Sequence, residues 1–275
     1  MSLNKEDYEE PRCPFDISRW KKAAPVRKIP LGRVIDKLDE YYNRNDYSGA
    51  VRLADYWIAE AKAGNDIAGE FALRNELMGT FRKIGNKEKA LENADLALSL
   101  VSEMGAEGTV SEGTALVNTA TVYRAFDLPE KSYEYFKIAV PIYEAQLQPG
   151  DWRLGGLYNN LAVTLTSLGK HDEAIAYLDR ALAAMELVEG SEGEQAVSWL
   201  NLADAYAAKF GLEGAEENIR RCCEKAIALM DTEGLSSDVN YAFYCEKCAP
   251  VLEYYGFFAA GKELAERADR IHSGS

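Results

Sequence analysis

The chain has 275 residues, of which 47% are hydrophobic, and its 31 Lys and Arg against 45 Asp and Glu give a formal net charge of −14. This acidic balance disfavours binding to nucleic acid and to anionic membranes, because like charges repel. No apolar run approaches the roughly 18 residues that a membrane span needs, and the N-terminus lacks the pattern of a secretion signal. We therefore expect a cytoplasmic protein that binds neither nucleic acid nor membrane.

Residues 1–30 differ from the rest of the chain and are predicted to form a non-repetitive N-terminal arm. Four prolines within them exclude a long helix. From Ile17 to Arg33 there are six basic residues and no acidic one. Two interpretations remain open. The arm either caps the first helices, with Phe15 and Trp20 as anchors, or lies on the acidic repeats and competes with a partner.

Residues 31–275 repeat with a period of about 42 residues. Ala97, Ala139, Ala181, Ala226 and Ala268 follow one another at spacings of 42, 42, 45 and 42. A fixed period in this range is typical of stacked helical pairs rather than of a closed globular core. The spacing predicts six repeats, at residues 31–66, 67–109, 110–150, 151–192, 193–236 and 237–275.

The clearest repeat covers residues 151–192. Leu161 and Leu165 fall on one helical face, Gly169 interrupts the pattern, and Leu178 and Ala181 lie on a second amphipathic helix. Its central string, NNLAVTLTSLGKHDEAIAYLDRAL, resembles a tetratricopeptide repeat, and the repeat length resembles the long repeats of kinesin light chains. The resemblance implies an all-α fold, a right-handed superhelical solenoid of about six helix-turn-helix repeats that serves as a noncatalytic scaffold.

The same resemblance implies that the first helix of each pair lines a concave groove. Asn118, Asn160 and Asn201 recur at one place in three successive repeats. An amide offers a donor and an acceptor together, as a peptide unit does, and the family uses equivalent asparagines to hold extended peptides. We predict that these three bind the backbone of a peptide; the alternative is that each amide satisfies its own helix.

Residues four before, three after and seven after each asparagine point to the same side of an α-helix. The predicted rows that line the groove are Thr114, Asn118, Thr121 and Ala125, then Gly156, Asn160, Val163 and Ser167, and then Val197, Asn201, Asp204 and Ala208.

The second repeat departs from this pattern. Glu76 takes the reference place with Asn75 beside it, and Arg82 and Lys83 follow one or two turns later. Together with Arg124, near the groove edge in the third repeat, they form a small basic island. This island is predicted to pair with a carboxylate of the ligand; the alternative is ordinary solvated helix surface.

The sequence favours no enzyme, metal or cofactor. Cys245 and Cys248 form a C-x-x-C, but they and Cys223 fall on core-facing helical positions, so we interpret them as packing residues rather than zinc ligands or a redox pair. The two histidines, His171 and His272, support no catalytic triad.

Two alternatives to a peptide-binding scaffold remain open. One is a bacterial sensor of signalling peptides, in which binding changes the superhelical pitch. The other is a self-associating structural protein, in which the terminal repeat around Phe257 and Phe258 stacks on a second copy to form a homodimer.

Overall fold

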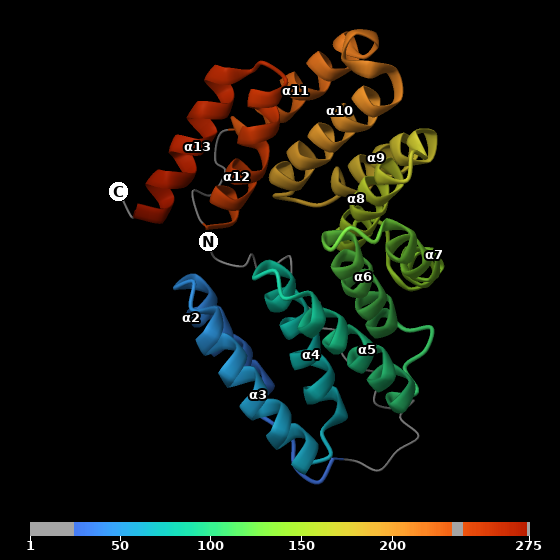
Figure 1. The fold of residues 1–275 in the computed structure, drawn as a ribbon, viewed down its shortest axis with the longest axis vertical. Helices are drawn as coiled ribbons and strands as arrows, with labels where there is room; N and C mark the ends of the chain where they lie inside the picture. The colour runs from blue at the N-terminus through green and yellow to red at the C-terminus, as the bar shows by residue number, and fades with distance from the viewer. Residues whose placement is uncertain (1–24, 233–238, 274–275) are drawn as a thin grey trace. The chain divides into compact units, whose positions relative to one another are not determined.

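The computed structural model describes residues 25–232 and 239–273, which form twelve α-helices and, within those ranges, no strand (Figure 1). The first six helices are α2 (Leu31–Asn43), α3 (Tyr47–Ala63), α4 (Ile67–Lys83), α5 (Lys87–Met104), α6 (Val110–Ala125) and α7 (Pro129–Gln146). The others are α8 (Trp152–Ser167), α9 (His171–Met185), α10 (Glu192–Gly214), α11 (Glu216–Met230), α12 (Val239–Tyr254) and α13 (Phe258–Ser273).

The chain divides into two compact units, Met1–Gln146 and Leu147–Ser275. In the first unit α2 pairs with α3, α4 with α5 and α6 with α7; in the second α8 pairs with α9, α10 with α11 and α12 with α13 (Figure 1). The six pairs coincide with the six repeats expected from the period. The predicted all-α array of about six helix-turn-helix repeats is therefore confirmed.

The chain before α2 lies against the turn between α3 and α4. The Arg27 backbone N–H donates to the Gly64 carbonyl (3.1 Å), and the Ile29 N–H donates to Oδ2 of Asp66 (2.9 Å). Ile29 is 8% exposed, so this contact also buries apolar surface. The predicted anchors Phe15 and Trp20 lie outside the described residues, and the boundary between arm and repeats stays a prediction.

Most of the turns between helices that lie wholly within the described ranges share one backbone feature, a residue with positive φ. Gly85, Asp127 and Gly169, which keep the 42-residue spacing, have φ of 75°, 57° and 71°. Each follows the first helix of its pair, where a left-handed residue ends the helix and reverses the chain. Asp127 takes the place of glycine because a short polar side chain tolerates this conformation better than most.

The alanines that carry the period lie between paired helices. Ala97, Ala139, Ala181 and Ala226 are 0% exposed and Ala268 is 2% exposed. Their small side chains let the two helix backbones approach closely, and larger neighbours such as Phe136 and Leu178 fill the remaining core. The period read from the sequence is therefore a period of packing.

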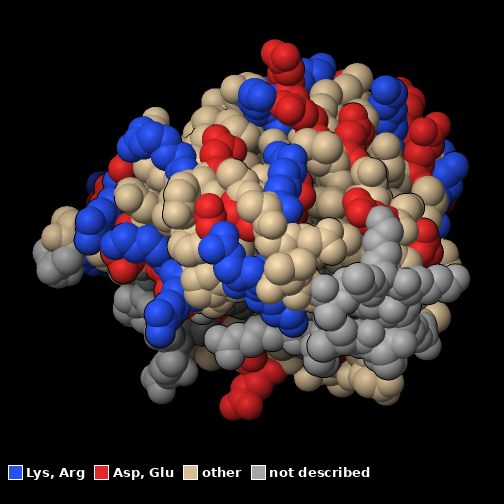
Figure 2. Space-filling view, turned by 90° about the horizontal axis from the view of Figure 1, so that it is seen from below, with Lys and Arg blue, Asp and Glu red and all other residues tan. Residues whose placement is uncertain are grey.

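Charged side chains of both signs are interspersed on the face shown in Figure 2. The net charge of −14 consequently does not produce a uniformly acidic surface. In the first unit one ion pair is also buried: Arg74 and Glu70, one helical turn apart on α4, lie 3.1 Å from each other, and Arg74 donates to Oδ1 of Asn93 on α5 (3.0 Å). Buried charges in proteins are normally paired in this way.

Candidate functional site

Some first helices of successive pairs contact one another: α4 contacts α6 in the first unit, and in the second unit α8 contacts α10 and α10 contacts α12. In the second unit the predicted rows point away from the core. Asn160, Val163, Val197 and Asn201 are half-buried, and Ser167 is exposed. The opposite faces of the same helices carry fully buried leucines and alanines. The rows on α8 and α10 therefore form a continuous polar and small-residue face.

The two predicted asparagines of this face differ in their hydrogen bonds. Asn160 Nδ2 donates to the Gly156 carbonyl of its own helix (2.9 Å). Asn201 Nδ2 donates across to Oδ1 of Asn159 on α8 (2.9 Å), so Asn159 joins the two helices. Since an amide has two N–H donors and a carbonyl that accepts twice, the bond to Asn159 does not use the full bonding capacity of Asn201. Asn159 is not among the residues predicted for the site.

Gly156 leaves space on the same face. A Cβ atom added to this residue would have no neighbouring atom within 4 Å. Gly155, the next residue toward the N-terminus, is opposite in character, because its added Cβ would lie 2.1 Å from the sulfur of Met185. Gly155 is thus required for the close packing of α8 against α9, and Gly156 leaves open space on the outer face of α8.

In the first unit the amides form a chain. Asn118 Nδ2 donates to Oδ1 of Asn75 (3.1 Å), and Asn75 Nδ2 donates to the Phe71 carbonyl (3.1 Å). Asn75 is 2% exposed whereas Asn118 is half-buried. The buried Asn75 therefore orients the more exposed Asn118 through their hydrogen bond. Thr114, by contrast, is buried and bonds to the Tyr143 hydroxyl of α7 (2.8 Å). Its predicted place on the groove face is wrong, because the hydroxyl turns toward the second helix of its own pair.

The three basic residues of the predicted island lie at helix ends. Arg82 and Lys83 are in the last turn of α4 and Arg124 is in the last turn of α6, and all three are half-buried. A positive charge at a helix C-terminus interacts favourably with the helix dipole. Lys83 Nζ also lies 5.8 Å from the centre of the Tyr47 ring. These residues therefore have a structural role in addition to the one predicted for them.

A fourth row, which sequence analysis did not single out, lies on α12. Phe243, Lys247, Pro250 and Tyr254 have the same spacing as the other rows, and we call them the α12 row. Tyr244 and Tyr255 on either side of this row reach α10, where their hydroxyls bond to Glu194 and Asp204. The α12 row has the same internal spacing as the earlier rows, but the extra residues within the fifth repeat shift its place relative to the 42-residue period.

The Tyr255 hydroxyl donates to Oδ1 of Asp204 with a distance of 2.6 Å. The pKa of Asp204 is raised because neighbouring protein atoms displace water around its carboxyl, and the hydrogen bond from Tyr255 opposes part of this effect. Part of Asp204 nevertheless stays exposed. The contact fixes the C-terminal end of α12 against α10, and with it the position of the α12 row.

The cysteines of α11 and α12 are core residues. Cys222, Cys223, Cys245 and Cys248 are all free thiols with 0% exposure, which confirms the packing interpretation. Across the part of the chain that the structure describes, no group of three or more possible metal ligands comes together. The fifth cysteine, Cys13, lies outside the described residues.

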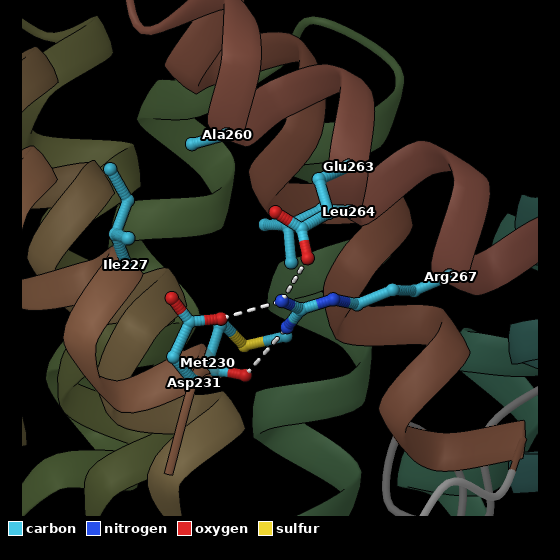
Figure 3. A pocket seen from close by; sticks show the side chains of 7 residues that line it. All are labelled: Ile227, Met230, Asp231, Ala260, Glu263, Leu264 and Arg267. Carbon is cyan, nitrogen blue, oxygen red and sulfur yellow. Dashed lines mark hydrogen bonds and ion pairs between the residues drawn. The ribbon is translucent and has the colours of Figure 1, made fainter.

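A small pocket between α11 and α13 is shown in Figure 3. Arg267 Nη2 lies 2.7 Å from Asp231 and 2.6 Å from Glu263, and Nη1 donates to the Met230 carbonyl and the Tyr241 hydroxyl. Burial acts to lower the pKa of Arg267, but these bonds outweigh it and the pKa is raised. The cavity measures about 20 Å³, room for roughly one water molecule. The bonds of Arg267 hold α13 in place, and the cavity is a structural feature rather than a ligand site.

Residues 153–228, from α8 to α11, match the family model described as tetratricopeptide repeat. These residues are similar to tetratricopeptide repeats. The resemblance inferred from the sequence is thereby confirmed. None of the helices within the described ranges is long and apolar enough to cross a membrane. A comparison with curated proteins gave no match.

Solved structures of low sequence identity share the fold. The nearly identical TPR-like repeats of a Podosopora anserina protein named as a kinesin light chain align with a TM-score of 0.51 at 19% identity, covering 73% of this chain and 94% of that one. BtubC (BKLC) from P. vanneervenii aligns with a TM-score of 0.56 at 19% identity, covering 90% of this chain and 92% of its own. The tetratricopeptide-like array is thus the shared feature.

Proposed function

We propose that this protein is a noncatalytic, cytoplasmic interaction scaffold that binds an extended peptide or partner segment along the first helices of its repeats. The observation that carries the proposal is the recurrence of half-buried asparagines, Asn118, Asn160 and Asn201, off the core on successive first helices. A tetratricopeptide array offers a long surface and no cluster of reactive groups, which suits recognition better than catalysis.

The predicted residues have different roles in this proposal. Asn160 and Asn201 hold the peptide backbone in the second unit, and Asn118 does so in the first. Asn75 acts through Asn118, because its own amide is 2% exposed and already bonded on both sides. Arg82, Lys83 and Arg124 pair with acidic groups of the ligand near the C-terminal ends of α4 and α6.

Each peptide hydrogen bond to an asparagine contributes about 0.5–1.5 kcal/mol. The double variant Asn160→Ala/Asn201→Ala should therefore weaken binding by roughly 5- to 150-fold. The measurement is fluorescence anisotropy with peptides selected on the full chain from a displayed library of random sequences. Far-UV circular dichroism should stay unchanged, although loss of the Asn201–Asn159 bond lowers the thermal midpoint slightly.

A matched control is Asn218→Ala, which removes a half-buried amide from α11, the second helix of its pair. This variant should bind the selected peptides as the wild type does. Equal affinity of the double variant and the wild type would contradict the proposed site. Unfolding of a single Asn160→Ala variant would show that this residue is structural.

Self-association is a second candidate, favoured by one observation. Phe258, the first residue of the last helix, is 69% exposed, and a large exposed apolar side chain at the end of a repeat array can pack on another copy.

A further inference from the structure

The α12 row differs chemically from the rows before it. The faces of α8 and α10 carry small and amide side chains, whereas the α12 row consists of two aromatic rings, a proline and a lysine. Tyr254 is 70% exposed, Lys247 and Pro250 are exposed, and Phe243 is half-buried. Apolar surface therefore becomes available at the same place on the first helix where the other repeats offer hydrogen bonds.

Lys247 is the charged member of this row. Its Nζ atom lies 5.2 Å from the centre of the Phe243 ring, and no carboxylate of the described residues forms an ion pair with it. In a chain with a net charge of −14, a cation that forms no ion pair within the described part of the protein provides a local site for an anionic group.

The structure holds the row in place. Tyr255 is fixed by its hydrogen bond to Asp204 (2.6 Å), and the Tyr254 ring meets the Tyr255 ring edge-on, with centroids 5.0 Å apart. Pro250 lies inside α12 and has no backbone N–H, so the Glu246 carbonyl lacks its usual helical donor. A surface that is already ordered loses less entropy when a partner binds.

We propose that the α12 row is a side-chain recognition subsite for a partner segment that carries a large apolar side chain next to a carboxylate. The apolar side chain would pack on Tyr254 and Pro250, and the carboxylate would pair with Lys247. This inference rests on the proposed function, because it assumes that the first helices bind an extended segment, and it adds which residues that segment must contain at α12.

The test is selection from a displayed library of random short peptides on the full-length protein, followed by affinity measurement by fluorescence anisotropy. The selected peptides should be enriched in an aromatic or large aliphatic residue adjacent to Asp or Glu. Lys247→Glu should weaken them roughly 3- to 30-fold, because an exposed ion pair is replaced by repulsion, and selection on this variant should enrich Lys or Arg instead. Tyr254→Ala should weaken them roughly tenfold.

The matched control is Lys225→Glu, which makes the same charge change at an exposed site on α11 and should leave affinity within about twofold, since a single exposed charge contributes little. The inference would be overturned, and the proposed function left intact, if the selected peptides bound the Asn160→Ala/Asn201→Ala protein more weakly but bound the Lys247→Glu and Tyr254→Ala proteins as they bind the wild type. Failure to select any peptide would overturn both. Dimerisation of the wild type that is lost in Tyr254→Ala would also overturn it, because a second copy would then cover the row.

Discussion

At the residue scale, the four buried cysteines show how environment sets chemistry. Burial raises the pKa of Cys222, Cys223 and Cys248 to about 12 and that of Cys245 to about 11, from an ordinary thiol value of 9.0. A thiol in this state is neither a nucleophile nor a metal ligand near neutral pH, because both roles need the thiolate. The C-x-x-C spacing of Cys245 and Cys248 therefore serves packing.

These pKa values predict alkaline destabilisation. The unfolded chain loses its thiol protons near pH 9, whereas the folded protein keeps them until about pH 11 to 12, so proton release favours the unfolded state in that window. We expect the urea midpoint, followed by circular dichroism, to fall steadily from pH 9 to 11. A Cys222→Ala/Cys223→Ala variant should show a shallower fall, and an identical slope in both proteins would contradict this explanation.

At the residue scale, the helical spacing predicted some of the groove-facing residues and failed for others. Spacing placed Asn160 and Asn201 correctly off the core, since that depends only on the helical period. It failed for Thr114, because whether a hydroxyl turns toward Tyr143 depends on how closely α6 and α7 approach. Asn75 likewise became a buried support for Asn118 through a contact between helices. Contacts of this kind come from the crossing geometry, which no single sequence pattern specifies.

At the scale of elements, helix ends were predictable because a left-handed turn residue has few alternatives. Gly85, Asp127 and Gly169 marked the ends of α4, α6 and α8 from their spacing. The fifth repeat is less regular: α10 runs to Gly214, past a break at Gly211 with φ 74° and ψ 166°. The extra residues there correspond to the longer spacing between Ala181 and Ala226, and they shift the place of the α12 row relative to the 42-residue period.

Gly156 lies inside α8 and Gly169 lies in the turn that follows it. Replacing each of them with alanine should therefore have opposite effects on stability. Gly169→Ala should destabilise by about 1–2 kcal/mol, because φ is 71° and an L-residue is strained there even though the space is open. Gly156→Ala should stabilise by about 0.5–1 kcal/mol, because it lies inside α8 with no atom near the added Cβ. Urea unfolding of both variants tests this, and a loss of stability in Gly156→Ala would contradict the open face.

At the scale of the whole molecule, the last helix pair carries the exposed apolar side chains on which the proposed self-association depends. Phe258 and Tyr254 are 69% and 70% exposed, and self-association through the last repeat would bury both. If it occurs, multi-angle light scattering should give twice the chain mass of 30.5 kDa at high concentration and the single mass on dilution. Phe258→Ser should then stay monomeric throughout, and a monomeric wild type at high concentration would exclude this candidate.

Within each unit the strong helix contacts join elements that are neighbours or next neighbours along the chain. Such local connectivity gives a low contact order, and helical proteins of this kind fold within microseconds to milliseconds. A ribosome adds roughly 5–20 residues per second, so one repeat of about 42 residues takes roughly 2–8 s to synthesise. Each helix pair therefore has time to close before the next one emerges, and the chain can assemble from its N-terminus while it is still being made.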